Sequence, residues 1–142
     1  MATIVFASDH AGFALKKHLV AYVKGLGHEV DDVGTHEESS CDYPDFGHAG
    51  ATKILATGKL GIFVCGSGIG ISIAANRHAG IRAVVCSEPF SAEMARRHND
   101  ANVLCMGSRV VGVGLAEKLV DAFLGASFEG GRHAGRVAKI EC

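Results

Sequence analysis

The sequence predicts an α/β protein in which one doubly wound, Rossmann-like sheet of five parallel strands is flanked by helices. Short strand-like runs alternate with longer stretches of helical periodicity, and this alternation is typical of βαβ units with right-handed crossovers. The strand-like runs are almost continuously apolar, as strands covered on both faces are. With 142 residues and no internal linker or repeat, the chain is expected to form a single domain, residues 1–142.

Each expected strand is a short run rich in apolar residues. The five runs are TIVFA (3–7), HEVDDVG (28–34, the weakest), LGIFVC (60–65), IRAVVC (81–86) and NVLCMG (102–107). Longer segments with a different periodicity separate them, so neighbouring strands are expected to be parallel and joined by helical crossovers.

The expected helices follow the apolar period of 3.6 residues. They cover residues 12–27, 46–58, 70–77, 91–99 and 111–125, and the stretch 35–45 is expected to be a polar loop. The apolar face of the first helix consists of Leu15, Leu19, Tyr22, Val23 and Leu26. Pro89 suits the turn before the fourth helix. Residues 126–142 are expected to form a C-terminal tail that is polar, partly basic and interrupted by glycines.

Composition and charge exclude several classes of protein. A net charge of −1 at pH 7 offers neither nucleic acid nor an anionic membrane a basic surface to bind. No stretch reaches 18 apolar residues, and Asp9 follows the first apolar run too early for a secretory signal peptide. We therefore expect a cytoplasmic protein without nucleic-acid or membrane partners.

The cysteine pattern argues against disulfides and against a structural zinc site. The five cysteines are Cys41, Cys65, Cys86, Cys105 and Cys142. Their number is odd and none belongs to a CxxC pair. Cys86 and Cys105 lie inside apolar runs, so both are expected to be small core residues.

Doubly wound sheets bind their ligands at the carboxyl ends of the strands, near the point where the strand order reverses. The residues expected there are Ser8-Asp9-His10, the loop from Gly34, Cys65-Gly66-Ser67-Gly68, Cys86-Ser87-Glu88 and Gly107-Ser108-Arg109. Nearly all of the reactive side chains fall in this set. The functional site is therefore expected at this edge of the sheet.

The stretch VCGSGIGISIAANR (64–77) places a cysteine before three glycines at the start of a helix. Ile71 stands where a dinucleotide fingerprint needs glycine and where a phosphatase loop needs arginine. A P-loop lysine is also missing, and Phe63 replaces the glycine of a nucleophile elbow. What remains is a glycine-rich helix N-terminus that can cradle an anion. The same field favours a thiolate at Cys65, but position alone equally allows an inert core cysteine.

Outside this loop each signal has two interpretations. His98 ends a helix and is either a half-exposed terminal residue or an acid–base group. Asp9 and His10 are either a helix N-cap pair or ligand contacts. Arg132 and Arg136 would share a face of a helical tail, where they either clamp one phosphate or are simply solvated.

Five segments of the chain carry a family resemblance. They are SDHAGF, DYP, CGSGIGISIAANR, GIRAVVCSEPFSAEMARRHNDANVLCMGSR and FEGGRHAGRV. Together they resemble the ribose-5-phosphate isomerase B family, which includes sugar-phosphate isomerases of the galactose-6-phosphate type, over about residues 3–137. The resemblance implies a homodimer, no metal and no organic cofactor. It also implies interconversion of ribose 5-phosphate and ribulose 5-phosphate, a step of the pentose phosphate pathway, through an enediolate.

The resemblance implies roles for particular residues. Cys65 is expected to transfer the proton, the amides from Gly66 to Gly70 with the Ser67 hydroxyl to form an oxyanion hole, and His98 to open the sugar ring. The implied substrate-binding residues are Asp9 (also expected to be catalytic), His10, Tyr43, Gly66, Ser67, Gly68, Ile69, Gly70, Asn99, Arg109, Arg132 and Arg136. In the family some of them belong to the second subunit, so the tail at 126–142 is expected to reach the partner in a homodimer, or in a tetramer of two dimers.

Two departures from the family pattern, and two alternative functions, remain. Many relatives have threonine at the position of Ser67, which preserves the hydroxyl. One branch of the family lacks the cysteine and uses a glutamate as the base, at the position where this chain has Ile71.

The first alternative function is the same chemistry on a six-carbon phosphate such as allose or galactose 6-phosphate. The second is a flavodoxin-like module that binds a phosphorylated ligand without turnover, although Cys65, His98 and Asp9 together favour catalysis.

Overall fold

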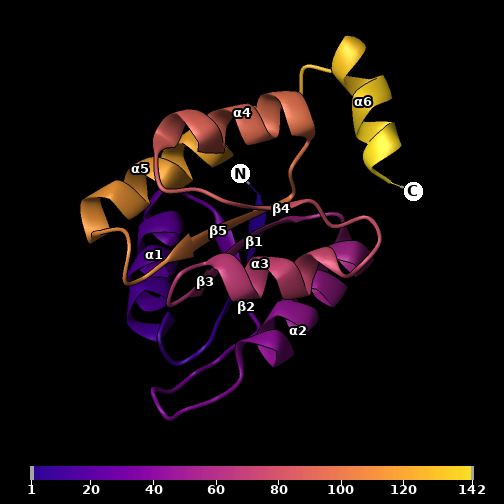
Figure 1. Ribbon diagram of the computed structural model, residues 1–142. Coiled ribbons are helices and arrows are strands. Elements are labelled where there is room, and N and C mark those ends of the chain that lie inside the picture. The colour runs from indigo at the N-terminus through magenta and orange to yellow at the C-terminus, as the bar shows by residue number, and fades with distance from the viewer. Residues whose placement is uncertain (1, 142) are drawn as a thin grey trace.

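A sheet of five parallel strands forms the central layer of the structure, a computed structural model that describes residues 2–141 (Figure 1). The strands are β1 (Thr3–Ser8), β2 (Glu29–Asp32), β3 (Leu60–Cys65), β4 (Ala83–Val85) and β5 (Val103–Gly107). Their order is β2-β1-β3-β5-β4 and every neighbouring pair is parallel, which confirms the predicted fold class. The chain continues from β1 and from β3 toward opposite edges of the sheet, so the order reverses between these two strands.

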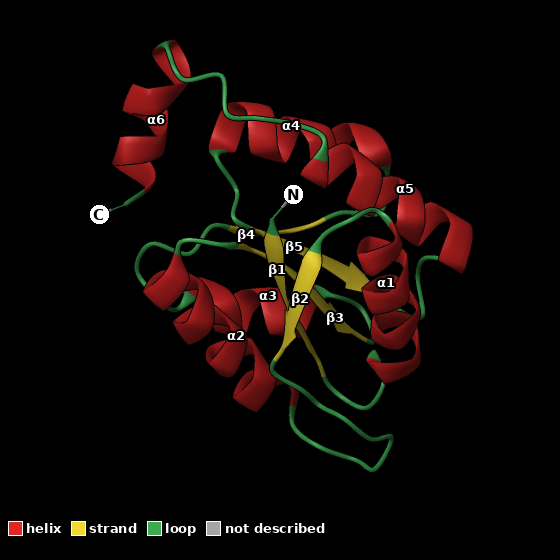
Figure 2. Ribbon diagram, turned by 180° about the vertical axis from the view of Figure 1, so that it is seen from behind, coloured by secondary structure: helices red, strands yellow, loops and turns green. Residues whose placement is uncertain are grey.

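Helices cover both faces of the sheet. The described residues form α1 (Phe13–Gly25), α2 (Tyr43–Thr57), α3 (Ile69–Asn76), α4 (Pro89–Asn99), α5 (Val113–Leu124) and α6 (Arg132–Ile140). Helices α1, α4 and α5 lie on one side of the sheet and α2 and α3 on the other (Figure 2). Side chains of β3 alternate between the two cores: Ile62 and Val64 face the first, and Phe63 and Cys65 face the second.

Two helices begin two or three residues earlier than the sequence predicts, and both have a proline in their first turn. Helix α2 starts at Tyr43 instead of residue 46, and α4 starts at Pro89 instead of residue 91. Proline fits the first turn because its missing N–H has no partner there and its φ is already helical. Tyr43 therefore belongs to a helix, whereas the sequence pattern assigned it to the polar loop.

The other differences lie at the margins of the sheet. The strands predicted at 28–34 and 81–86 contribute only Glu29–Asp32 and Ala83–Val85, and both are edge strands with a single neighbour.

The apolar face predicted for α1 is only partly buried. Leu15, Leu19 and Val23 are buried, but Tyr22 is partly exposed and Leu26, beyond the helix end, is 49% exposed.

A buried lysine joins α1 to the loop that follows β2. Lys16 has no exposed surface. Its Nζ donates a hydrogen bond to Oδ1 of Asp32 at 2.6 Å and another to the carbonyl oxygen of Thr35 at 2.5 Å. The Thr35 N–H in turn donates to the carbonyl of Ser8 at 2.7 Å. Lys16 thus anchors the segment beside the carboxyl end of β1.

Within the tail predicted at 126–142, residues Arg132–Ile140 form α6. This helix projects from the end of α4 away from the sheet (Figures 1 and 2). His133 is its buried residue, and its ring stacks on His98. At the other end, Glu141 accepts a hydrogen bond from Arg82 at 2.7 Å. The helix is therefore fixed at both ends while most of its surface faces solvent.

Candidate active site

The loop between β3 and α3 packs so tightly against β5 that it requires glycine. Gly68 has φ +82°, and a Cβ there would lie 2.8 Å from the carbonyl carbon of Met106. A Cβ on Gly107 would lie 2.6 Å from the carbonyl carbon of Ser67. The loop backbone and the first turn of α3 are thereby held at the carboxyl edge of the sheet, where the positive end of a helix favours an anion.

Cys65 is the last residue of β3 and lies under this loop. It is 4% exposed, and its Sγ accepts a hydrogen bond from the Gly68 N–H at 3.2 Å. The N-terminus of α3 adds positive partial charge beside the sulfur. The Ser67 hydroxyl is exposed and accepts from the Ile69 N–H at 3.2 Å. Thiol, hydroxyl and amide groups therefore point to one small region.

A cavity of about 580 Å³ opens over this region, and we call it the Cys65 pocket. It is lined by Asp9, Tyr43, Cys65, Gly66, Ser67, Ile69, Gly70, Ile73, Arg109 and Val110. Its size suits a small-molecule ligand. Of the predicted site residues, eight line this pocket, and Gly68 belongs to the same loop. The sequence analysis did not single out the two apolar residues Ile73 and Val110.

Three side chains around the Cys65 pocket are fixed by specific contacts. Asp9 is 6% exposed and its Oδ1 accepts from the Gly12 N–H at 3.0 Å, so one carboxylate oxygen serves the start of α1. Tyr43 lies against Gly70, where a Cβ would come within 2.5 Å of its ring. The Arg109 guanidinium rests beside Gly66, since a Cβ there would be 3.5 Å from Nη1.

His10, next to Asp9, has a defined tautomer. Its Nδ1 accepts a hydrogen bond from the Cys41 N–H at 3.2 Å, so in the neutral ring the proton is on Nε2. The Cys41 backbone, in the loop before α2, thus orients an N–H donor at the end of β1. No motif in the sequence indicated this contact.

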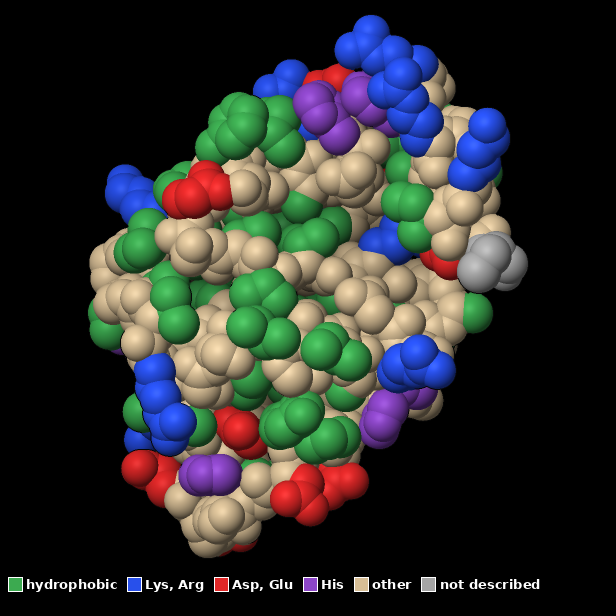
Figure 3. Space-filling view, in the orientation of Figure 1, with side chains coloured by type: hydrophobic (Ala, Val, Ile, Leu, Met, Phe, Trp, Pro, Cys, Tyr) green, Lys and Arg blue, Asp and Glu red, His purple; other side chains and the backbone are tan. Residues whose placement is uncertain are grey.

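The remaining predicted residues lie elsewhere in the chain. Among residues 2–141, the lining of the Cys65 pocket does not include His98, Asn99, Arg132 or Arg136. His98 and Asn99 end α4, and the two arginines lie on the exposed side of α6. Histidine and basic side chains gather where α6 meets the end of α4 (Figure 3). One chain therefore carries the predicted site as two separate groups.

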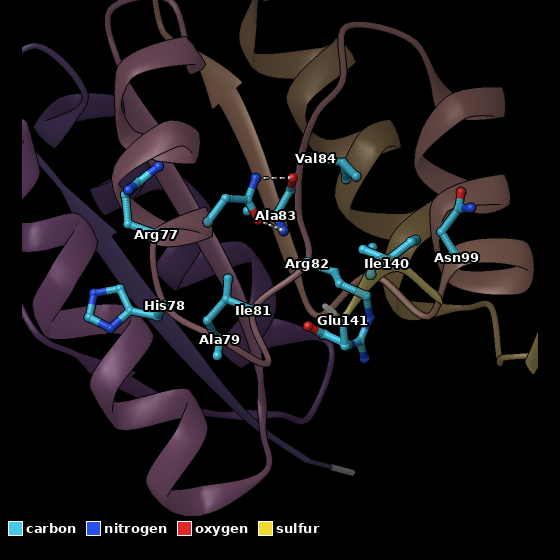
Figure 4. A pocket seen from close by; sticks show the side chains of 12 residues that line it. Arg77, His78, Ala79, Ile81, Arg82, Ala83, Val84, Asn99, Ile140 and Glu141 are labelled. Carbon is cyan, nitrogen blue, oxygen red and sulfur yellow. Dashed lines mark hydrogen bonds and ion pairs between the residues drawn. The ribbon is translucent and has the colours of Figure 1, made fainter. Parts of the chain in front are cut away.

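Asn99 lines a second cavity of about 610 Å³, beneath the C-terminal end of α6 (Figure 4). Arg82, Ile140 and Glu141 close one side of it, and Arg77 and His78 lie on the other. It is slightly larger than the Cys65 pocket but contains neither the cysteine nor the glycine loop. The chemistry of its lining is less suited to catalysis, so we place the candidate active site at Cys65.

The sequence pattern did not indicate the surroundings of His98. The His98 and His133 rings are stacked, with centroids 4.3 Å apart and planes at 10°. Oε1 of Glu129 lies 3.7 Å from Nε2 of His98 and 3.6 Å from Nε2 of His133. We call these three residues the His98 cluster. Glu129 and His133 are four residues apart in FEGGRHAGRV, which was the available signal.

The His98 cluster has the residue types of a transition-metal site, and its ligand atoms all lie within 4.8 Å of one another. Imidazole nitrogens bind metals along lone pairs in the ring plane. Because the two rings are stacked nearly parallel, these lone pairs do not converge on one point. The observed arrangement is suited to sharing protons and not to holding an ion.

The pKa values of two buried cysteines and of two residues of the His98 cluster are shifted. Burial raises the pKa of Cys86 to about 11, and burial together with nearby Cys65 holds that of Cys105 well above its usual value. Both thiols are core residues, as predicted. Burial lowers the pKa of His133, and the neighbouring His98 and Arg132 lower it further. The hydrogen bond from Arg97 lowers the pKa of Glu129.

A thiol at a glycine-lined helix N-terminus, facing a carboxylate and an arginine across one cavity, defines a class of protein. It is an α/β protein suited to binding a small anion and to acid–base chemistry on it. The chain belongs to the Ribose/Galactose Isomerase family, whose model matches residues 4–140. Within residues 2–141, no helix has both the length and the apolar character needed to span a membrane.

Relatives of known name and structure agree with this assignment. The chain is 54% identical to ribose-5-phosphate isomerase B of Escherichia coli, with 99% of this chain and 95% of the relative covered. It resembles the structure of Clostridium thermocellum ribose-5-phosphate isomerase B with a TM-score of 0.95 and 50% identity, over 99% and 95% of the two chains. The Mycoplasma genitalium enzyme with bound ribulose-5-phosphate gives a TM-score of 0.93 and 42% identity, over 98% and 93%.

Proposed function

We propose that the chain is an aldose–ketose isomerase that interconverts D-ribose 5-phosphate and D-ribulose 5-phosphate. The observation that carries the proposal is Cys65, whose sulfur lies under a glycine-rich helix N-terminus and lines a pocket with Asp9 and Arg109. A 54% identical relative is a ribose-5-phosphate isomerase B, and another relative of known structure has ribulose-5-phosphate bound. This reaction requires a group that transfers a proton and a site that binds the phosphate group.

The reaction then proceeds by proton transfer at carbon. In the open-chain aldose the Cys65 thiolate removes the proton from C2, and electrons move to the carbonyl oxygen on C1. The C2 hydroxyl then loses its proton, the C1 oxygen gains one, and the proton held by Cys65 returns to C1, which gives the ketose. The amides from Gly66 to Gly70 and the Ser67 hydroxyl stabilise the enediolate oxygen. Asp9, His10 and Tyr43 contact the sugar, and Arg109 helps to bind the phosphate.

The site is completed by a second copy of the chain. His98, Asn99, Arg132 and Arg136 do not line the Cys65 pocket of their own chain, among the residues that the structure describes. Helix α6 lies outside the layers formed by the sheet and the other helices, at the margin of the molecule (Figure 1), and this position leaves it accessible to a second copy. Ile69 and Ile73, at the rim of the pocket, are 55% and 58% exposed, as expected of an apolar interface. The proposed assembly is a homodimer with shared sites, and a tetramer of two dimers is compatible with it.

Two wider assignments follow from the proposed activity. The enzyme works in the cytoplasm, on a sugar phosphate of the pentose phosphate pathway. The reaction needs no metal or organic cofactor, since Cys65 and His98 supply proton transfer and the loop amides supply charge stabilisation.

A six-carbon sugar phosphate is the second candidate substrate, because the family description covers ribose and galactose isomerases. The test compares progress curves with ribose 5-phosphate, allose 6-phosphate and galactose 6-phosphate at equal concentration. The proposal is supported if ribose 5-phosphate is converted faster than either six-carbon phosphate. Faster turnover of a six-carbon phosphate reassigns the substrate, and binding of ribose 5-phosphate without any turnover identifies a non-catalytic module.

A further inference from the structure

The His98 cluster joins two imidazole rings from different helices to one carboxylate. His98 comes from the last turn of α4, His133 from the first turn of α6 and Glu129 from the segment between α5 and α6. Oε1 of Glu129 is almost equally distant from Nε2 of both rings, at 3.7 and 3.6 Å. These distances exceed those of a hydrogen bond, but a carboxylate this close still attracts a proton on either ring.

Glu129 is held in this position by Arg97. Its backbone N–H donates to the Arg97 carbonyl oxygen at 3.0 Å. Its Oε2 accepts from Nε of Arg97 at 2.7 Å and lies 2.7 Å from Nη2, so Oε1 remains for the two rings. Arg97 is steadied by Glu93 on the same helix, at 2.8 Å. The hydrogen bond from Arg97 lowers the pKa of Glu129, which keeps this carboxylate ionised at neutral pH.

His133 supports the His98 ring without carrying charge itself. Its side chain is 11% exposed. Burial lowers its pKa first, and the nearby positive groups His98, Arg132 and Arg136 lower it further, while Glu129 acts in the opposite direction. His133 is therefore the neutral ring of the stack at neutral pH. Two charged rings 4.3 Å apart would repel each other.

The charges around His98 are mostly positive. Arg97 precedes it on α4, and Arg132 and Arg136 of α6 lie close enough to the stacked His133 ring to lower its pKa. Two nearby acidic residues interact with other groups. Glu93 accepts a hydrogen bond from Arg97, and Asp121 of α5 accepts one from Tyr22 at 2.6 Å. Glu129 is the anion that faces the rings. Without it, a proton on His98 would lose its nearest counter-charge.

We propose that Glu129 and His133 are positioning residues for His98: His133 holds the ring in place by stacking, and Glu129 balances the charge when His98 takes up a proton. This deepens the proposed function and rests on it for the step concerned. In that step His98 takes the proton of the C1 hydroxyl and delivers a proton to the ring oxygen, as the bond between C1 and the ring oxygen breaks and the C1 carbonyl forms.

The test compares Glu129→Gln with Glu93→Gln. Both variants remove one carboxylate charge next to Arg97, and glutamine at 129 can still accept the Arg97 hydrogen bonds. Only the first removes the charge that faces His98. Glu129→Gln is expected to lower kcat for ribose 5-phosphate roughly 10- to 100-fold, with KM changed less than about threefold. Glu93→Gln should behave like the wild type.

A second readout separates positioning from loss of structure. Exchange of the C1 proton of ribulose 5-phosphate with deuterated solvent needs no ring opening, so Glu129→Gln should retain it. His133→Phe, which keeps a flat ring, should retain more ring-opening activity than His133→Ala. Equal losses in Glu129→Gln and Glu93→Gln, or equal losses of isomerisation and exchange, would overturn the proposal.

A third readout does not depend on the reaction. The ¹⁵N spectrum of the His98 ring at neutral pH should change in Glu129→Gln and stay unchanged in Glu93→Gln, because only Glu129 faces the ring. If the wild type does not turn over ribose 5-phosphate but the spectrum responds in this way, the proposed function fails and the charge coupling stands. An unchanged spectrum in both variants refutes the coupling.

Discussion

At the scale of single residues, Cys65 differs from the other buried cysteines by its neighbours. Its sulfur accepts an N–H and lines an open pocket, whereas burial raises the pKa of Cys86 to about 11. Cys65→Ala is expected to abolish isomerisation and leave inorganic-phosphate binding nearly unchanged, because the loop amides and Arg109 remain. Cys65→Ser should be almost as inactive, since a hydroxyl is far less acidic than a thiol.

Steady-state kinetics and calorimetry with phosphate measure these effects, and Cys86→Ala is the matched control. Alkylation should inactivate the wild type by modifying Cys65, and substrate should protect against it. An alanine variant at 65 with wild-type activity would disprove the assignment.

His98 supplies a separate prediction, because ring opening and proton transfer at carbon are different steps. His98→Asn should greatly slow turnover of ribose 5-phosphate. It should still exchange the C1 proton of ribulose 5-phosphate, which cannot close into a furanose. Proton NMR in deuterated buffer measures the exchange. If both rates fall together, His98 serves the enediolate step or the fold instead.

Residues at the end of a strand or just after it could be predicted from the sequence, whereas contacts between distant helices could not. Asp9, Cys65 and Arg109 were expected at the ligand edge because parallel strands present their carboxyl ends together, and all three line one pocket. Glu129 and His133 were missed because their relation to His98 depends on how α6 meets α4. His10 was expected near the site, but its orientation by the Cys41 backbone depends on a loop whose conformation has no local signature.

At the scale of elements, the sequence pattern located all five strands and the first five helices, and failed mainly at their ends. The starts of α2 and α4 were placed too late because Pro44 and Pro89 were treated as loop residues. The edge strands β2 and β4 are shorter than their apolar runs because they pair on one side only. Helix α6 has a single buried residue, so no apolar period could indicate where it packs.

The attachment of α1 to the segment after β2 gives a prediction about stability. Lys16→Met removes the donor to the Asp32 carboxylate and to the Thr35 carbonyl. Breaking a buried pair leaves the partner groups unsatisfied, and Asp32 is 27% exposed, so water recovers part of the loss. The free energy of unfolding should fall by about 2–3 kcal/mol.

Urea unfolding at pH 7 measures this change, with Lys17→Met as the matched control. Lys17 is the adjacent, exposed lysine of the same helix, and its replacement should change stability by less than about 0.5 kcal/mol. Equal effects of the two substitutions would show that the buried contacts of Lys16 do not stabilise the fold.

At the scale of the whole molecule, the predicted site residues form two groups that one chain does not unite. The glycine loop and Arg109 lie at the edge of the sheet, while Arg132 and Arg136 lie on a helix that projects beyond it (Figure 2). A projecting basic helix on a chain of net charge −1 indicates a specific anion. We therefore expect Arg136→Ala to weaken binding of substrate and of inorganic phosphate together, by roughly 10- to 100-fold.

Mixing Arg136→Ala with Cys65→Ala tests whether sites are shared between chains. In a shared arrangement, each site takes Cys65 from one subunit and Arg136 from the other, so a mixed dimer contains one site with both residues intact. At substrate concentrations well below KM, activity should then exceed that of either parent variant after subunit exchange, which native mass spectrometry can verify. If each site is built from one chain, every site in the mixture keeps one of the two defects. No gain in activity despite confirmed exchange would therefore refute the shared site, because isologous dimers leave no other arrangement in which the two substitutions complement each other.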